Sequence, residues 1–199
     1  ILRCLVGSEM CIRDRSYTLN WMMKLWFYAD TVAETGGGTP LADSRKIYQR
    51  LDPAVRDKFA EKGIMYVRNY GVGMGLPWQE TFQTDSPEEV DAFCRDAQIE
   101  TEWLADGRLR TRQIRPAVRL HPKTGETIWF NHGLFFHVTS LEPETRDSLL
   151  AGLAEEDLPT NTYYGDGTPF EPEVLDQIRT AFEQELSLIH ISEPTRHRR

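Results

Sequence analysis

The sequence predicts a mainly β fold of the α+β class, in which a core of antiparallel sheet carries helical insertions. Short β-rich runs are interleaved with helical segments, but the strict strand-helix-strand alternation of a parallel sheet is missing. The turn-forming runs Ala105–Gly107 and Lys123–Gly125 each separate two β-rich segments. Each of these runs therefore predicts a β-hairpin.

Five helices are expected along the chain. The first follows three glycines, with Pro40 in its first turn and good helix formers from Ala42 to Leu51. Ser86, Pro87 and Glu89 form a helix start, with a capping serine, proline at the first helical position and glutamate at the capping-box position. The other three helices are predicted over Ala54–Lys62, which Gly63 ends, and over Pro143–Leu153 and Pro172–Glu185.

The remaining segments are expected to be strands or loops. Strands are predicted over Lys24–Val32 and Ile64–Tyr70, and two hairpins between Ile99 and Asn131. The run from Leu158 to Phe170 is rich in turn residues, so it is expected to be a loop.

The two ends of the chain resemble translated copies of one inverted DNA repeat. The codons that give Leu186–Arg196 have a reverse complement that translates as Leu5–Arg15, as expected for a sequencing-library adaptor. The alternative is a native basic tail and a native amphipathic strand. We expect residues 1–15 and 186–199 to be adaptor-like artefacts and residues 16–185 to be an internal fragment of one domain.

Charge and cysteine content limit the classes of partner. The net charge of −8 becomes −11 without the two end runs, because those runs hold six basic and three acidic residues. This balance argues against nucleic-acid and anionic-membrane partners. Cys94 is then the single cysteine, so a reducing, cytoplasmic location is expected. No apolar run approaches the ~20 residues that span a bilayer.

The most informative run is Gly36–Gly38, followed by Thr39. Consecutive glycines allow positive φ and a close approach of another group to the backbone. The run resembles a phosphate-binding loop, but the lysine that such a loop places after its last glycine is missing. A nucleotide-binding protein is therefore a weaker alternative, which saturable ATP or GTP binding would support.

Several segments together resemble the taurine dioxygenase (TauD/TfdA) family, in its clavaminate-synthase-like branch. The resemblance extends over essentially all of residues 16–185, in the same order and at similar spacing. The segments are S-Y-T-L-N, G-G-G-T-P-L-A-D-S-R, Y-V-R-N-Y, W-Q-E-T-F-Q-T, E-W-L-A-D-G-R-L-R-T, P-A-V-R-L-H-P-K-T-G-E, W-F-N-H and L-P-T-N-T-Y-Y-G-D-G.

The resemblance implies an incomplete double-stranded β-helix (jelly roll, cupin-like) and an Fe(II)- and 2-oxoglutarate-dependent dioxygenase that uses O₂. The expected reaction is oxidation, typically hydroxylation, of a small amino-acid-like or carboxylated substrate. The alternative from another class is a cupin-like binding or structural protein without catalysis.

The resemblance also implies where site residues lie. Thr39 matches a threonine whose hydroxyl bonds 2-oxoglutarate; the alternative is a helix-capping threonine. Asn131 ends the run W-F-N and could give its amide to the pocket, or form a turn. The family's H-x-D/E pair lies just before the S-Y-T segment, and its distal histidine and arginine follow the helix that matches Pro172–Glu185. We therefore expect no metal ligand in this chain, and we expect the chain alone to be inactive.

Other polar side chains have structural interpretations. His121, His132, His137 and Asp166 could be written as a metal set, but His132 and His137 lack H-x-D spacing, and Asp166 is expected to shape a turn. Cys94 is expected in the core. Five arginines are expected on a solvated face, with one able to meet an anionic substrate: Arg108, Arg110, Arg112, Arg115 and Arg119.

Overall fold

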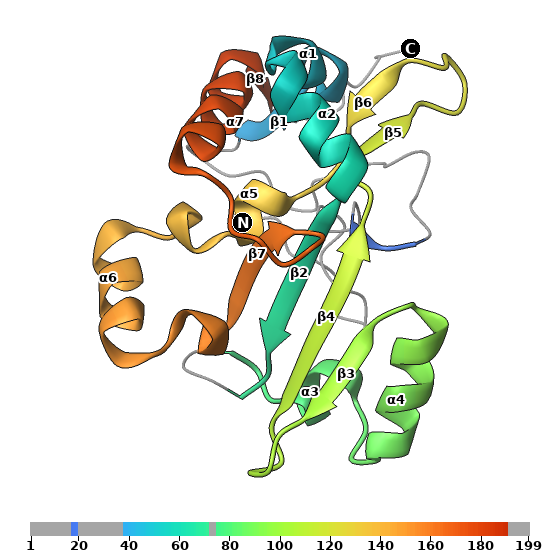
Figure 1. Ribbon diagram of the computed structural model, residues 1–199, viewed down its shortest axis with the longest axis vertical. Helices are drawn as coiled ribbons and strands as arrows, with labels where there is room; N and C mark the ends of the chain where they lie inside the picture. Colours follow the sequence, from blue (N-terminus) through green and yellow to red (C-terminus); the bar gives the residue numbers. More distant parts are fainter. Residues whose placement is uncertain (1–16, 20–37, 72–74, 191–199) are drawn as a thin grey trace, which may run out of the picture.

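Three antiparallel sheets form the β part of the fold. The computed structural model describes residues 17–19, 38–71 and 75–190, and every strand pair in these ranges is antiparallel. The largest sheet has the order β3-β4-β2-β7, and β1-β8 and β5-β6 form two smaller sheets (Figure 1). The strands are β1 (Gly38–Ala42), β2 (Ile64–Asn69), β3 (Glu100–Trp103), β4 (Leu109–Arg115), β5 (Val118–Leu120), β6 (Thr127–Trp129), β7 (Thr160–Tyr164) and β8 (Leu186–His190).

Helices gather at both ends of the large sheet. Figure 1 shows α1, α2 and α7 at one end, with α3 and α4 at the other. The helices are α1 (Ser44–Arg50), α2 (Pro53–Lys62), α3 (Trp78–Phe82), α4 (Pro87–Asp96), α5 (Gly133–Phe136), α6 (Pro143–Gly152) and α7 (Pro172–Glu185), with short 3₁₀ turns at Val138–Ser140 and Glu155–Asp157. The antiparallel sheets with helical insertions agree with the predicted α+β class, but the predicted mainly β content is wrong, because helices hold more of the described residues than strands do.

The predicted helix signals work as expected at two positions. The Ser86 hydroxyl accepts the Glu89 amide at 3.3 Å and so caps α4. The Glu89 carboxylate does not close the capping box on Ser86, because it accepts the Thr84 hydroxyl instead. Gly63 ends α2 with φ of +69°, a conformation that favours glycine.

The loop predicted over Leu158–Phe170 is wrong for its first part, which forms β7. This strand pairs with β2 along Ile64–Arg68. Two of its three buried residues are polar, and each finds a partner: the Thr162 hydroxyl donates to the Gly133 carbonyl at 2.7 Å, and Asn161 accepts the Val138 amide at 3.1 Å. Local composition indicated a loop, because the partners that allow these polar residues to be buried are distant in the sequence.

Two hydrophobic clusters hold the helices on the sheet. The larger lies under α1, α2 and α7 and includes Ile47, Phe59, Ile64, Tyr164 and Ile178. The smaller joins α3 and α4 to the other end through Tyr70, Trp78, Val90, Cys94 and Leu109. The burial of Cys94 confirms its predicted place in the core, and burial raises the pKa of its thiol to about 11.

Two predictions concern the ends of the chain. The strand predicted over Lys24–Val32 lies outside the described residues. Leu186–His190 belongs to the run predicted as adaptor-like, and here it pairs with β1 over five positions. Within the described ranges, every helix is too short or too polar to cross a bilayer.

Candidate functional site

The glycine run leads into a strand rather than a helix. Gly38 and Thr39 are the first residues of β1, and Thr39 pairs with Ile189 of β8; Gly36 and Gly37 lie outside the described residues. Helix α1 begins only at Ser44, so the prediction that Pro40 lies in its first turn is wrong. The reason is the better cap at Asp43, whose carboxylate accepts the Arg45 amide at 3.0 Å.

This arrangement removes two alternatives for the run. The capping position belongs to Asp43, so Thr39 is not the helix cap. A phosphate loop also needs a helix N-terminus directly after its glycines, and a five-residue strand stands there instead. The interpretation of Thr39 as a contact for 2-oxoglutarate stays a prediction.

Asn131 uses its amide to close a turn. Its Nδ2 donates to the Ala117 carbonyl at 2.8 Å, and its Oδ1 accepts the Gly133 amide at 2.9 Å. The residue is buried, and these bonds tie the β6–α5 connection to the start of α5 and to the residue before β5. The bond to Gly133 fits the turn-forming alternative, while a role toward a cofactor remains a prediction.

The side chains of His121 and His137 serve local structure, and His132 contributes its backbone amide. The Nδ1 atom of His121 lies 3.2 Å from the amide nitrogen of Thr124, and Nδ1 of His137 lies 2.8 Å from the Thr139 hydroxyl. The backbone amide of His132 donates to the Tyr66 hydroxyl at 3.1 Å. The described residues hold no group of three or more His, Cys, Asp or Glu side chains suited to a metal. These residues therefore do not fit a two-histidine, one-carboxylate iron centre.

Asp166 shapes its turn as predicted. Its carboxylate accepts the backbone amide of Thr168 at 3.0 Å and the hydroxyl of the same residue at 2.6 Å. The ammonium of Lys62 binds the same carboxylate, and these bonds lower the pKa of Asp166. The carboxylate therefore binds groups of its own turn and the Lys62 side chain of α2.

Acid should destabilise the fold through His137. Burial, with the nearby charge of Arg179, lowers its pKa from 6.5 to about 4. The unfolded state therefore binds more protons between these values, so stability falls as the pH drops through this window, by up to about 1.4 kcal/mol per pH unit. Urea unfolding at pH 7 and pH 5 should show a smaller loss for His137→Gln than for the parent. His121→Gln is the control, and a parental loss in both variants would contradict the assignment.

The predicted solvated face of arginines is wrong for Arg110 and Arg115. Arg110 donates to Asn69 Oδ1 at 2.7 Å and to Asp157 Oδ1 at 2.8 Å, and it is buried. Asn69 in turn donates to the Leu158 carbonyl at 2.7 Å. This network fastens the segment before β7 onto the centre of the sheet.

The buried guanidinium of Arg115 is hydrogen-bonded mainly to backbone carbonyls. Its guanidinium donates to the carbonyls of Tyr17 (2.8 Å), Ala97 (2.7 Å), Gln98 (3.2 Å) and Ile114 (2.9 Å), and to Gln113 Oε1. Burial lowers its pKa, although the group remains charged. Arg115 therefore joins the N-terminal segment at Tyr17 to the end of α4.

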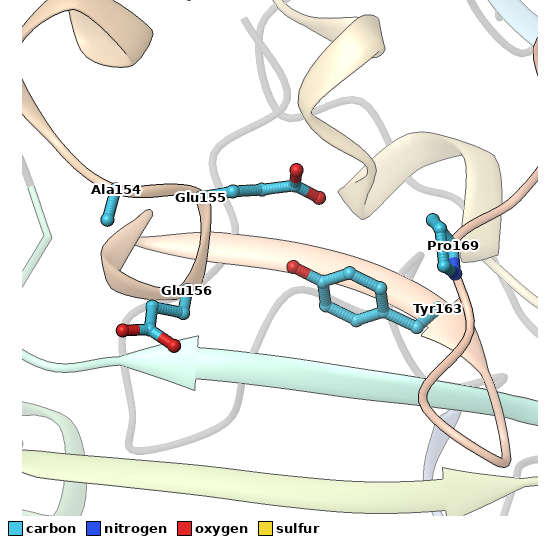
Figure 2. Close-up of a pocket in the computed structure, with 5 residues that line it drawn as sticks. All are labelled: Ala154, Glu155, Glu156, Tyr163 and Pro169. Atoms are coloured by element: carbon cyan, nitrogen blue, oxygen red, sulfur yellow. The ribbon is translucent and has the colours of Figure 1, made fainter.

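An open hollow of about 410 Å³ lies beside β7. Figure 2 shows its lining, with the Tyr163 hydroxyl pointing toward the segment that carries the two glutamates. The buried Asn161 amide donates to Glu155 Oε1 at 3.1 Å and to the Tyr163 hydroxyl at 3.0 Å. The polar groups of the hollow thus anchor this segment on the strand. The lining residues are Ala154, Glu155, Glu156, Tyr163 and Pro169.

Comparison with known proteins settles the family. The model of the family described as "Taurine catabolism dioxygenase TauD, TfdA family" matches residues 13–192. The chain belongs to the TauD/TfdA family. Members are oxygenases that use Fe(II), 2-oxoglutarate and O₂ and act on small molecules, and the resemblance in the sequence motifs is confirmed.

Two curated proteins are similar to this chain over most of its length. The dapdiamide synthesis protein DdaC of Enterobacter agglomerans is 43% identical over 158 residues, which cover 79% of this chain and 48% of DdaC. A clavaminate synthase-like protein of Arabidopsis thaliana is 26% identical over 172 residues, covering 81% of this chain and 49% of the relative. This TauD/TfdA chain thus spans about half the length of the curated relatives it matches.

Proposed function

We propose that this chain is part of an Fe(II)- and 2-oxoglutarate-dependent dioxygenase that oxidises a small amino-acid-like or carboxylated substrate. The observation that carries the proposal is the family match over residues 13–192. The 43% identity to DdaC supports the same general chemistry. The antiparallel sheets are compatible with part of a double-stranded β-helix, which we propose as the core of the whole protein.

Within this proposal, Thr39 supplies a hydrogen bond to 2-oxoglutarate. Its support is the G-G-x-T match and the place of the residue directly after glycines, where a ligand can come close to the backbone. A hydroxyl can donate to a carboxylate oxygen of the co-substrate. Asn131 is the second proposed contact. Its two bonds to the backbone use one Nδ2 hydrogen and one Oδ1 lone pair, and the second hydrogen and second lone pair are proposed to bind the co-substrate.

The iron must then be held by residues other than those described. His121 and His137 are engaged locally, and the described side chains bring no ligand set together. We propose that the ligands lie in sequence that precedes the S-Y-T segment and follows α7 in a native-length protein. In that protein the iron would supply the oxidising chemistry, and this chain would supply co-substrate contacts and scaffold.

Replacing Thr39 tests this role. In the native-length enzyme, Thr39→Ala should raise the KM for 2-oxoglutarate about ten- to hundredfold, since a hydrogen bond to a charged group contributes about 1.5–3 kcal/mol. The KM for the prime substrate should change less. Thr39→Ser keeps the hydroxyl and should stay near the parent. A larger effect on the prime substrate would place Thr39 elsewhere in the site.

A further inference from the structure

The C-terminal ends of α1 and α7 are joined by an ion pair whose carboxylate is nearly buried and whose cations are partly exposed. Glu185 is the last residue of α7, and its side chain is 7% exposed. Arg50, the last residue of α1, donates to Glu185 Oε1 through Nε at 2.6 Å and also through Nη2. Lys46 Nζ lies 3.6 Å from Glu185 Oε2. A carboxylate at such low exposure is thereby neutralised by two cations from one neighbouring helix.

Further polar contacts join α7 to α1 and to the start of α2. Arg50 Nη1 donates to Gln184 Oε1 at 2.9 Å. Two turns earlier in α7, Gln177 accepts the amide of Asp52, the N-cap of α2, at 2.9 Å and donates to its carboxylate at 2.6 Å. Directional bonds therefore hold α7 against both α1 and the α1–α2 connection.

Both helices continue directly into the ladder that contains Thr39. Only Asp43 separates β1 from α1, and β8 follows Glu185 with no intervening residue. Ala42 and Leu186 are paired where the two strands meet the helices. The ion pair thus lies at the closed end of the ladder, where the helices determine how the strands meet.

The ladder needs this support because it has two strands. Two paired strands alone are marginally stable in water. Packing against helices is the usual remedy, and α7 contacts β1 as well as α1. Removing Arg50 leaves the Glu185 carboxylate, whose side chain is 7% exposed, with Lys46 alone at 3.6 Å, so the loss should exceed that of a fully exposed pair although Arg50 itself is 43% exposed.

We propose that Arg50 and Glu185 are positioning residues that hold β1, and with it Thr39, in place. The importance of this for catalysis rests on the function proposed above for Thr39 and on a native strand in the place of β8, because β8 belongs to the run predicted as adaptor-like. The positioning itself is a property of the backbone of β1, so it can be measured without substrate, iron or activity.

Amide hydrogen exchange on the 199-residue chain tests the inference. Glu185→Ala and Arg50→Ala should each speed exchange in β1 and β8 at least about tenfold, while β2 and β4 exchange as in the parent. The double variant should match the single variants, since both remove one interaction. Arg50→Glu with Glu185→Arg should restore slow exchange.

The matched control is Glu183→Ala, because Glu183 is an exposed residue of α7 two positions before Glu185. It should leave exchange in β1 unchanged. Equal acceleration in β2 and β4, including complete unfolding, would overturn the inference, as would unchanged exchange in β1 or an equal effect of the control. Failure of Thr39→Ala to alter the KM for 2-oxoglutarate would instead contradict the proposed function alone.

Discussion

Phe59→Ala should lower the free energy of unfolding by about 3–5 kcal/mol, as expected for loss of a fully buried aromatic side chain. Phe59 is 1% exposed and lies at the centre of the larger cluster. Its ring centroid is 5.0 Å from that of Trp129, 4.9 Å from Tyr164 and 5.2 Å from Phe170. Truncation would leave a cavity between α2, β6 and β7, because three rigid rings cannot close it.

Urea unfolding followed by circular dichroism measures this change. Phe93→Ala is the matched control, since Phe93 is 59% exposed and lies on the outer side of α4. We expect the control to cost less than about 1 kcal/mol. Equal losses in the two variants would show that Phe59 does not organise the core.

Arg115→Met should cost about 3–5 kcal/mol of stability. Methionine keeps an apolar stem of similar length but removes every donor, so four backbone carbonyls and the Gln113 side chain lose a partner. Each buried acceptor left without a bond costs about 1–3 kcal/mol, and relaxation or entry of water recovers part of the sum. The joint between Tyr17 and the end of α4 should loosen first.

Arg108→Met separates this effect from a simple loss of charge. The Arg108 side chain is 38% exposed and bonds to Asp106 within the same turn. This control should change stability by less than about 1 kcal/mol. A loss for Arg115→Met as small as that of the control would contradict the assigned role of the buried guanidinium.

Local signals predicted much of the fold. The two hairpins formed where Gly107 and Gly125 supply positive φ, at +80° and +71°. Pro172–Glu185 is helical over the predicted range. These features depend on neighbours within a few residues, so a single sequence carries them.

The wrong predictions concern residues whose structure depends on partners far away in the sequence. β7 was predicted to be a loop because its buried Asn161 and Thr162 are polar, and Gly133 and Val138 provide their bonds. Arg110 looked solvated because pairing opposite Asn69 depends on strand register, which composition does not reveal. Pro40 looked like a helix start because the pairing of β1 with β8 joins residues almost 150 positions apart.

In the candidate site, too, sequence motifs predicted some features and missed those that depend on distant partners. Sequence motifs found the family, and with it the proposed role of Thr39. They could not show that Asn131 makes two hydrogen bonds, to the backbone of Ala117 and of Gly133, or that Asn161 binds both Glu155 and Tyr163. Asparagine alternates between turn, cap and ligand roles, so its partners must be seen before its role is assigned.

We propose that this chain contributes co-substrate contacts to a TauD/TfdA dioxygenase whose iron ligands lie outside the described residues. Succinate formation from 2-oxoglutarate, measured with Fe(II) under O₂, tests it most directly when the native-length protein and the 199-residue chain are assayed side by side. We predict succinate from the native-length protein and none above background from the chain. Succinate production by the chain, or its absence from the native-length protein with a range of amino-acid-like substrates, would contradict the claim.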